Sequence, residues 1–324
     1  MTSFWHSLKG PIKVLAPMED VTDTVFRRIV ARCGRPDVFF TEFTNTDGMC
    51  SEGRDAVIHR LQFTEEERPI VAQIWGNNPE HYLRASRDLS SMGFDGIDIN
   101  MGCPVKKIVK NGHCSALIEN KPLVQELIAA AKEGAGEIPV SVKTRLGFRR
   151  LETEHWAQFL LEQNPAVLTM HGRIAKEMSD FPANWEEIGK VVKLRDEMGS
   201  ETLIIGNGDV ESLEDIELKA RSYGVDGAMV GRGIFHNIFL FDPDRSGTEV
   251  PPPERIALLL DHLHLYRATW GSDKNFEVMK KFVKVYVTGF QGAAKLRGHL
   301  MEASDYAQID EILADWSKSY SPAL

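Results

Sequence analysis

Long apolar runs are absent from this sequence of 324 residues, and their absence excludes one class of membrane protein. No stretch of about 18 consecutive apolar residues occurs, so we expect no transmembrane helix. Residues 1–17 also lack a charged start followed by a long apolar core, so we expect no signal peptide. Together with the few cysteines of the chain, these expectations lead us to expect a cytoplasmic protein.

Cysteine is scarce as well. The four cysteines are Cys33, Cys50, Cys103 and Cys114, and no two of them form a C-x-x-C pair. Too few are present for a disulfide scaffold, and a structural zinc site is not expected. No cluster of histidine and carboxylate residues has the spacing of metal ligands, so a metal hydrolase is the least favoured enzyme class. Free thiols are typical of a reducing compartment.

Basic residues are in the minority, because the net charge is −9. This acidic net charge argues against a surface that is basic overall and binds nucleic acid everywhere. One segment is the exception: residues 274–297 contain six basic residues and a single acidic one, Glu277. A basic face of this kind can bind a polyanion. A solvated helix face is the simpler alternative.

Short apolar segments rich in valine and isoleucine alternate with amphipathic segments along most of the chain. The eight strand candidates are Ile12–Ala16, Val38–Glu42, Ile70–Ile74, Gly96–Ile99, Pro139–Lys143, Val167–Met170, Leu203–Ile205 and Ala228–Val230. The helix candidates are Thr22–Cys33, Pro79–Met92, Pro122–Lys132, Thr153–Glu162, Trp185–Met198 and Ser212–Tyr223. Such alternation predicts an α/β protein with a (β/α)8 TIM barrel. A doubly wound sheet would need a glycine fingerprint after the first strand, and residues 15–20 contain no glycine.

Three consecutive prolines, at positions 251–253, indicate a boundary, since proline interrupts both helices and sheets. Four helical segments follow, at Glu254–Trp270, Phe276–Thr288, Gly292–Met301 and Tyr306–Lys318. We therefore expect a barrel domain over residues 1–250 and an all-helical domain over residues 251–324.

The most informative motif is Asn100-Met101-Gly102-Cys103-Pro104, which directly follows an apolar strand. It delivers a thiol to the carboxyl end of a strand, where barrel enzymes carry out their chemistry. A buried cysteine that acts only as a small apolar residue is the alternative. The glycine and proline that flank Cys103 argue against a strand or helix interior.

The last two strands end in glycine-rich loops, Gly206-Asn207-Gly208-Asp209 and Gly231-Arg232-Gly233. Barrels commonly bind phosphate with the loops after strands seven and eight, and an arginine can pair with phosphate through two hydrogen bonds. The sequence therefore predicts a phosphate site that includes Arg232. Tight turns without a ligand are the alternative.

Three other polar residues occur where strands end. Lys143 suits a flavin, whose reduced ring is anionic, although a Schiff-base lysine or an ion pair with Glu42 would also account for it. Gln73 either hydrogen-bonds a cofactor or satisfies a strand end. His171 could contact phosphate, cofactor or substrate.

Taken in order, these segments resemble the tRNA-dihydrouridine synthases. The motifs that carry the resemblance are Ala16-Pro17-Met18-Glu19-Asp20, Thr41-Glu42, Ala72-Gln73, Asn100 to Pro104, Val142-Lys143-Thr144-Arg145, His171-Gly172-Arg173 and the two glycine-rich loops, with Lys280-Lys281 and Gly292 to Arg297 in the tail. Each motif is weak alone, whereas their order and spacing make the match strong.

The resemblance implies an enzyme that binds FMN, takes electrons from NADPH, and reduces the carbon 5–carbon 6 double bond of a uridine in tRNA. Cys103 matches the cysteine that protonates carbon 5. The residues that match the flavin site are Pro17, Met18, Gln73, Lys143, His171, Asn207, Gly208, Gly231 and Arg232. Those expected to contact the substrate are Asn100 and Arg145 in the barrel, and Lys280, Lys281, Lys284, Lys295 and Arg297 in the helical domain. No metal and no obligate protein partner are implied.

Cys114 departs from the family pattern, which usually has glycine there, so it is a rival to Cys103. Glu19-Asp20 also departs from the usual Ala-Gly or Glu-Gly. Two other functions stay open: a flavin barrel enzyme acting on a free pyrimidine or enone, which would not need the basic tail, and an RNA-binding protein that has lost catalysis.

Overall fold

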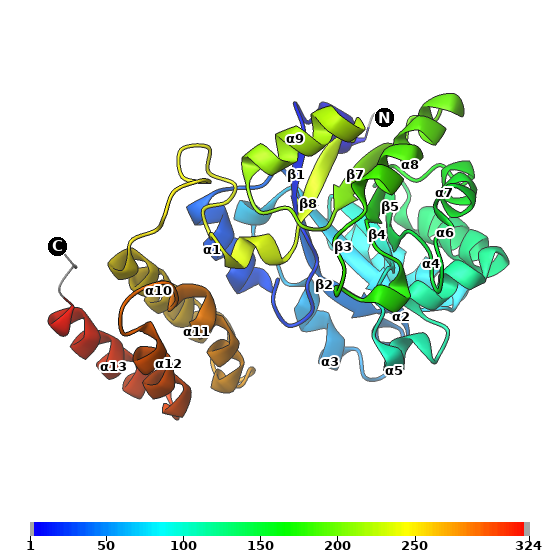
Figure 1. Ribbon diagram of the computed structural model, residues 1–324. Coiled ribbons are helices and arrows are strands. Elements are labelled where there is room, and N and C mark those ends of the chain that lie inside the picture. Colours follow the sequence, from blue (N-terminus) through cyan, green and yellow to red (C-terminus); the bar gives the residue numbers. More distant parts are fainter. Residues whose placement is uncertain (1–2, 321–324) are drawn as a thin grey trace.

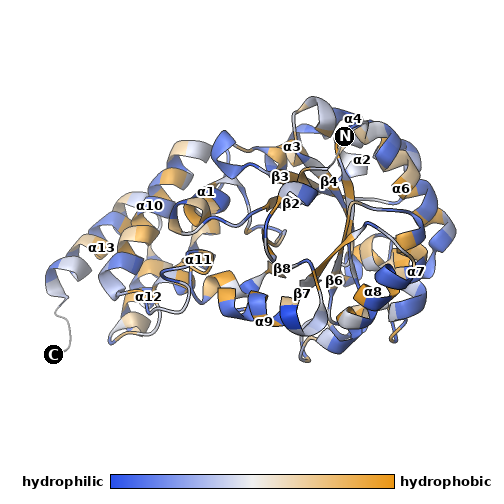
Figure 2. Ribbon diagram, turned by 90° about the horizontal axis from the view of Figure 1, so that it is seen from above, coloured by the Kyte–Doolittle hydropathy of each residue, from blue (hydrophilic) through white to orange (hydrophobic). Residues whose placement is uncertain are grey.

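The computed structural model describes residues 3–320 and confirms the barrel. Eight parallel strands pair in the order β1-β8-β7-β6-β5-β4-β3-β2. A bridge between Val14 and Val38 brings the two ends of this sheet together and closes the ring. Seen from above, the ring of strands lies inside a ring of helices (Figure 2). The strands are β1 (Ile12–Leu15), β2 (Phe39–Asn45), β3 (Ile70–Trp75), β4 (Gly96–Met101), β5 (Val140–Arg145), β6 (Val167–His171), β7 (Leu203–Asn207) and β8 (Gly227–Val230).

The helices of the barrel follow the sequence prediction closely. They are α1 (Thr24–Cys33), α4 (Pro79–Ser91), α6 (Lys121–Ala135), α7 (Thr153–Glu162), α8 (Trp185–Glu197) and α9 (Leu213–Tyr223). Shorter segments lie in the loops: η1 (Phe4–Ser7), α2 (Thr46–Met49), α3 (Asp55–Ile58), η2 (His59–Leu61), η3 (Glu65–Glu67), α5 (Lys106–Val109), η4 (Cys114–Glu119), η5 (Ala175–Glu177) and η6 (Arg232–Phe235). None of these short helices was predicted.

The predicted boundaries are wrong at the start of one helix and at the ends of several strands. Helix α1 begins at Thr24 and not at Thr22, because the side chain of Asp23 accepts a hydrogen bond from the Phe26 amide and caps the helix. Several strands also run further than predicted. Consequently Asn100, Arg145 and Asn207 lie within the ends of β4, β5 and β7 and not in the loops after them.

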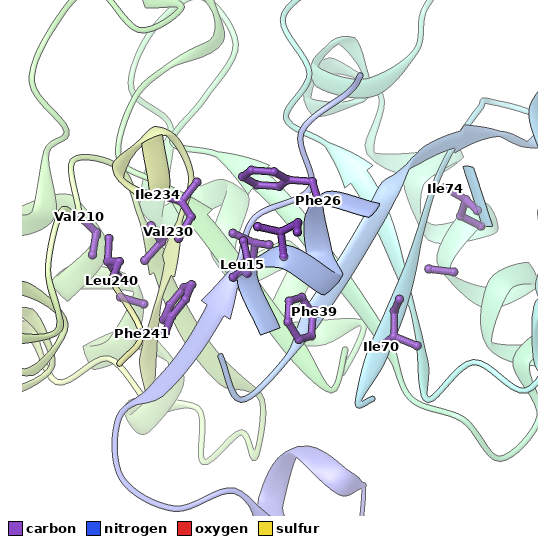
Figure 3. Close-up of a cluster of buried hydrophobic side chains, with 14 of the residues drawn as sticks. Leu15, Phe26, Phe39, Ile70, Ile74, Val210, Val230, Ile234, Leu240 and Phe241 are labelled. Atoms are coloured by element: carbon purple, nitrogen blue, oxygen red, sulfur yellow. The ribbon is translucent and has the colours of Figure 1, made fainter. Parts of the chain in front are cut away.

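Apolar side chains fill the space between the strands and the outer helices. Figure 3 shows part of this core, where Leu15 of β1, Phe39 of β2 and Val230 of β8 lie among Phe26 of α1 and Ile234 of η6. These side chains are at most 1% exposed. Burial on both faces accounts for the continuous apolar character of the strands.

The C-terminal region is all-helical, as predicted. Its elements are α10 (Pro252–Trp270), η7 (Phe276–Met279), α11 (Lys280–Tyr286), α12 (Ala293–Glu302) and α13 (Tyr306–Ser319). The proline run does not precede the first helix but opens it, since Pro252 and Pro253 occupy its first turn, where a missing N–H costs no hydrogen bond. The predicted helix Phe276–Thr288 is divided into η7 and α11.

These C-terminal helices lie to one side of the barrel, beside α1 (Figure 1). Phe26 of α1 stacks on Phe282 of α11 with ring centroids 5.4 Å apart. Asp23, the cap of α1, also accepts hydrogen bonds from Trp270 Nε1 (3.0 Å) and Lys274 Nζ (3.4 Å). One aspartate thus joins the barrel to α10 and to the segment that follows it. Over residues 3–320, no helix combines the length and the apolar character that crossing a bilayer requires.

Candidate functional site

A cavity of about 480 Å³ lies at the carboxyl ends of the strands. Its size is typical of a site for a small molecule or cofactor. It contains eight of the nine residues that the sequence assigned to the cofactor: Pro17, Met18, Lys143, His171, Asn207, Gly208, Gly231 and Arg232. These residues come from five different strands or the loops after them, so the closure of the barrel brings them together.

Three cationic residues, Lys143, Arg173 and Arg232, line the cavity together with the carboxylates of Asp209 and Glu211. Burial lowers the pKa of Lys143 to about 8, and its ammonium donates a hydrogen bond to Asn207 Oδ1 at 3.0 Å. The ion pair with Glu42 that the sequence left open is therefore not formed. Burial, together with Lys143, Arg145, Arg173 and Arg232, holds the pKa of His171 well below its usual range. His171 is accordingly neutral. Because Arg173 is paired with Asp209, the positive charge that the cavity offers a ligand comes from Lys143 and Arg232.

Arg232 is exposed at the cavity, and no hydrogen bond or ion pair to its guanidinium occurs among the residues that the structure describes. Beside it, a Cβ atom added to Gly231 would meet no atom closer than 4.0 Å, so the space next to this backbone is open. Gly208, which follows the neighbouring strand β7, has φ of +121°, a conformation that side chains disfavour. Open backbone next to an unpaired guanidinium fits a phosphate group.

Arg173 was not assigned to the site from the sequence, although it follows His171 in the same motif. It is only 3% exposed, and both oxygens of Asp209 accept hydrogen bonds from its Nη2 at 2.7 Å. Its Nη1 lies 3.1 Å from His171 Nε2. Because arginine only donates, Nε2 of His171 accepts and carries no proton. Arg173 is therefore a positioning residue that fixes the tautomer of His171.

Asn100 shapes the backbone that carries Cys103. Its Oδ1 accepts hydrogen bonds from the amides of Gly102 (3.0 Å) and Cys103 (2.8 Å). This short Asx turn stops β4 and turns the chain at the strand end. The side chain of Arg145 holds the same turn from β5, because its Nε donates to the carbonyl of Gly102 at 2.7 Å.

Gln73 is the one expected cofactor residue that does not line the cavity. It is fully buried, its Nε2 donates to Asp98 Oδ2 at 2.7 Å, and its Oε1 accepts from Asn100 Nδ2 at 2.9 Å. Ser141 donates to the other oxygen of Asp98 at 2.6 Å. Gln73 therefore holds the side chain of Asn100 in place through the hydrogen bond at its Oε1.

The two cysteines that the sequence left as rivals lie together. Cys103 is partly exposed, whereas Cys114 is fully buried and has φ of +53°. The neighbouring thiol of Cys114 lowers the pKa of Cys103 to about 7, with the Val105 backbone and Arg145 as weaker causes. Burial raises the pKa of Cys114 well above its usual range. Cys103 is therefore the acidic member of the pair and Cys114 the protonated one.

The five basic residues of the tail are not equivalent. Lys284 and Lys295 are exposed, and neither forms an ion pair among residues 3–320. Lys280 pairs with Glu277 at 2.8 Å, and Arg297 donates to the carbonyl of Val287 at 2.8 Å. Lys281 donates to the backbone carbonyl of Asp20 in the loop after β1. Within the described residues, no group of three or more histidine, cysteine and carboxylate side chains could hold a metal ion.

The fold and the cavity define a TIM-barrel enzyme with a polar ligand site at the carboxyl ends of its strands. Comparison with known sequences gives the family: residues 14–320 match the model of the dihydrouridine synthase (Dus) family, and the chain belongs to it. The "Probable tRNA-dihydrouridine synthase 2" of Bacillus subtilis is 44% identical over 98% of each chain. The "Probable tRNA-dihydrouridine synthase" of Staphylococcus epidermidis is 45% identical over 96% of this chain and 95% of its own.

Solved structures with the same barrel are more distant. A morphinone reductase in complex with tetrahydroNAD has a TM-score of 0.51 and 14% identity, and the match covers 74% of this chain and 87% of that one. A histamine dehydrogenase from Rhizobium sp. 4-9 has a TM-score of 0.56 and 13% identity, covering 78% and 48%. At these identities the likeness concerns the fold alone.

Proposed function

We propose that this protein reduces the carbon 5–carbon 6 double bond of specific uridines in tRNA, with FMN as its cofactor, NADPH as the reductant and Cys103 as the general acid. The relatives named above support the reaction and the tRNA substrate. The observation that carries the proposal is the cavity with Lys143, the open backbone at Gly231 and the unpaired Arg232, on a barrel that also holds the acidic thiol of Cys103.

The residues present fit a flavin mononucleotide. Arg232, with the backbone of Gly208 and Gly231, would hold the phosphate, while Pro17, Met18, Lys143, His171 and Asn207 would surround the ring. The bound flavin would supply a hydride to the substrate. A cation such as Lys143 beside the ring favours the negative charge that the reduced form carries.

Cys103 would give its proton to carbon 5 of the uracil. Hydride addition at carbon 6 leaves enolate character on a ring conjugated to a carbonyl, so a proton donor is needed. Asn100 and Arg145 fix the backbone beside this thiol, and the charge of Arg145 favours an electron-rich uracil. A uridine inside a folded RNA cannot reach a barrel end unless it is extruded.

We further propose that residues 1–250 form the catalytic domain and residues 251–324 the domain that binds tRNA. Lys281, which contacts the loop after β1, joins the basic segment to the edge of the barrel that carries the cavity. Lys280, Lys284, Lys295 and Arg297 would then meet phosphates of an RNA whose uridine enters the site. A soluble enzyme of the cytoplasm, where tRNA is modified, is the setting that this proposal requires.

The test uses the purified protein and tRNA that lacks dihydrouridine. Cys103→Ala should keep the flavin absorbance and lose about a hundred- to ten-thousand-fold in uridine reduction. Arg232→Ala should release flavin during gel filtration. Cys50→Ala and Arg221→Ala are matched controls outside the cavity and should behave as the parent protein. Full activity of Cys103→Ala would contradict the role of Cys103.

Two outcomes would favour the other functions. Turnover of free uracil or dihydroorotate without RNA would indicate a flavin enzyme of small pyrimidines. A colourless protein that still binds tRNA would indicate a binding protein without catalysis.

A further inference from the structure

Cys114 is not itself the proton donor in the reaction proposed above, yet its position beside Cys103 is specific. It lies eleven residues after Cys103, and the chain between them returns through α5 so that the amide of Ser115 donates to the carbonyl of Cys103 at 3.3 Å. The two thiols also shift each other's pKa, as neighbouring groups do. Two cysteines whose backbones are held together by this hydrogen bond need little movement to form a disulfide, whose geometry requires adjacent Cβ atoms.

The two thiols also differ in the way that peroxide chemistry requires. Cys103 is partly exposed at the carboxyl ends of the strands, whereas Cys114 is fully buried behind it. A thiol with a pKa of about 7 is a thiolate in a large fraction of molecules near neutral pH, and the thiolate is the species that attacks peroxide. Cys114 stays protonated and shielded until its neighbour has reacted.

We propose that Cys103 and Cys114 form a peroxide-sensitive modification site, in which Cys103 is oxidised first and Cys114 resolves it to an intramolecular disulfide. The inference concerns the thiols themselves and does not depend on the substrate of the enzyme. If Cys103 is the general acid, the disulfide also removes its proton and stops the reaction reversibly.

The chemistry balances with hydrogen peroxide as the oxidant. The Cys103 thiolate attacks one peroxide oxygen, so an S–O bond forms, the O–O bond breaks and hydroxide leaves. The Cys114 sulfur then attacks the sulfur of the sulfenic acid, an S–S bond forms, and the hydroxyl leaves with the proton of Cys114 as water. Two thiols and one peroxide give one disulfide and two waters, and a dithiol reductant reverses the change.

Cys114 has a second effect in this scheme, because it protects Cys103. A sulfenic acid without a neighbouring thiol is oxidised further to sulfinic acid, which thiol reductants do not reverse. Removing Cys114 should therefore convert reversible oxidation into permanent oxidation. Cys114→Gly is the suitable variant, because glycine accepts the positive φ of this position without strain.

The experiment treats the full chain with hydrogen peroxide, blocks free thiols, and digests it with trypsin. Lys106, Lys107 and Lys110 lie between the two cysteines, so trypsin separates them onto different peptides. Mass spectrometry should find these two peptides joined, lighter by two hydrogen atoms, and separated again by dithiothreitol. Cys114→Gly should show no joined peptide and should accumulate sulfinic acid on Cys103. Cys50→Ser is the matched control and should give the joined peptide at the rate of the parent protein.

Free thiols at both positions after peroxide treatment of the parent protein would overturn the inference. The same is true if Cys103 reaches the sulfinic acid equally fast in the parent protein and in Cys114→Gly. The mapping in the parent protein needs no variant, so it decides the matter even if Cys114→Gly folds poorly. Because it reads the peptides and not turnover, it is also separate from any failure of the proposed reductase activity.

Discussion

The neighbouring thiol of Cys114 lowers the pKa of Cys103 to about 7, and this shift should be visible in the pH profile of the proposed reaction. The proposed general acid must be protonated to act, so the rate of uridine reduction should fall as the pH rises above 7. Cys114→Gly removes the neighbouring thiol, which raises the pKa of Cys103 and moves this decline to higher pH. Single-turnover rates with prereduced protein between pH 6 and 9 are the measurement. An unchanged profile in Cys114→Gly would show that the pair does not control the proton.

Glu42 is a buried carboxyl group that keeps its proton to a higher pH than an exposed glutamate does. This carboxyl is 2% exposed, its Oε1 accepts from the Asp20 amide at 2.7 Å, and its Oε2 has no partner among the described residues. Burial raises its pKa to about 7, Asp23 and Glu19 add to this shift, and Lys274 and Arg60 oppose it. Between pH 4.5 and about 7, Glu42 therefore keeps its proton in the folded protein, whereas the unfolded chain has already released it.

Glu42 therefore makes the stability of the protein depend on pH. The contribution of protonated Glu42 is present below its ordinary pKa of 4.5 and is lost as the pH rises towards 7. Glu42→Gln should match the parent protein near pH 4 and exceed its free energy of unfolding by at most about 3 kcal/mol at pH 8. Urea denaturation at several pH values measures this difference. Glu52→Gln, at an exposed position, is the control and should change stability by less than about 0.5 kcal/mol throughout.

Helix α1 is held to the loop between β2 and β3 by a buried ion pair. Arg27 Nε donates to Glu67 Oε2 at 2.6 Å with both side chains fully buried, and Thr24 donates to the other oxygen at 2.6 Å. Removing one partner leaves an unpaired buried charge. Because α1 also carries the cap Asp23, this pair supports the junction between the barrel and α10.

Glu67→Ala should therefore lower the free energy of unfolding by about 3–5 kcal/mol. Glu66→Ala is a matched control one residue away, since Glu66 pairs with Arg28 at the surface and should cost only about 0–1 kcal/mol. Denaturation by guanidinium chloride followed by circular dichroism compares them. Equal losses in the two variants would contradict the importance of burial for this pair.

The sequence predicts the order of the elements better than their ends. Strand and helix alternation is a local pattern, so the barrel and most of its helices follow from it. The end of a strand depends on long-range pairing, for example the register of Asn100 with Lys143, which extends β4 past the predicted end. Similarly, nothing in the run Glu65-Glu66-Glu67 distinguishes the buried carboxylate from its two more exposed neighbours.

At the cavity, too, the sequence predicts which residues meet better than it predicts the contacts between them. Motifs at strand ends predict residues that meet there because the barrel closes, and all but Gln73 of the expected cofactor residues line it. The contact between Cys103 and Cys114 depends on how the intervening loop returns, which no motif encodes. The structure thus adds the partners of the predicted residues: Arg173 for His171, Gln73 for Asn100, and Cys114 for Cys103.

The arrangement of the barrel and the C-terminal helices bears on how an RNA would bind. Trp270, Lys274 and Lys281 all contact residues 20–23 of the barrel, so the basic segment is fixed close to the loop that follows β1. The net charge of −9 makes the rest of the surface unattractive to a polyanion. An RNA bound through the exposed lysines of α11 and α12 would thus be directed to the cavity by geometry as well as by charge.

This arrangement predicts that tRNA affinity depends strongly on salt and on a few lysines. Lys284→Glu and Lys295→Glu should each weaken tRNA binding and reduce the slope of log Kd against log salt concentration by about 1, because each lysine would release about one counterion on binding phosphate. Lys193→Glu, an exposed position on α8, makes the same change in net charge and should leave the slope unchanged. Fluorescence anisotropy with labelled tRNA at several potassium chloride concentrations measures both quantities. If all three variants lose affinity equally, net charge and not the helical region governs binding, and the assignment of tRNA binding to residues 251–324 is wrong.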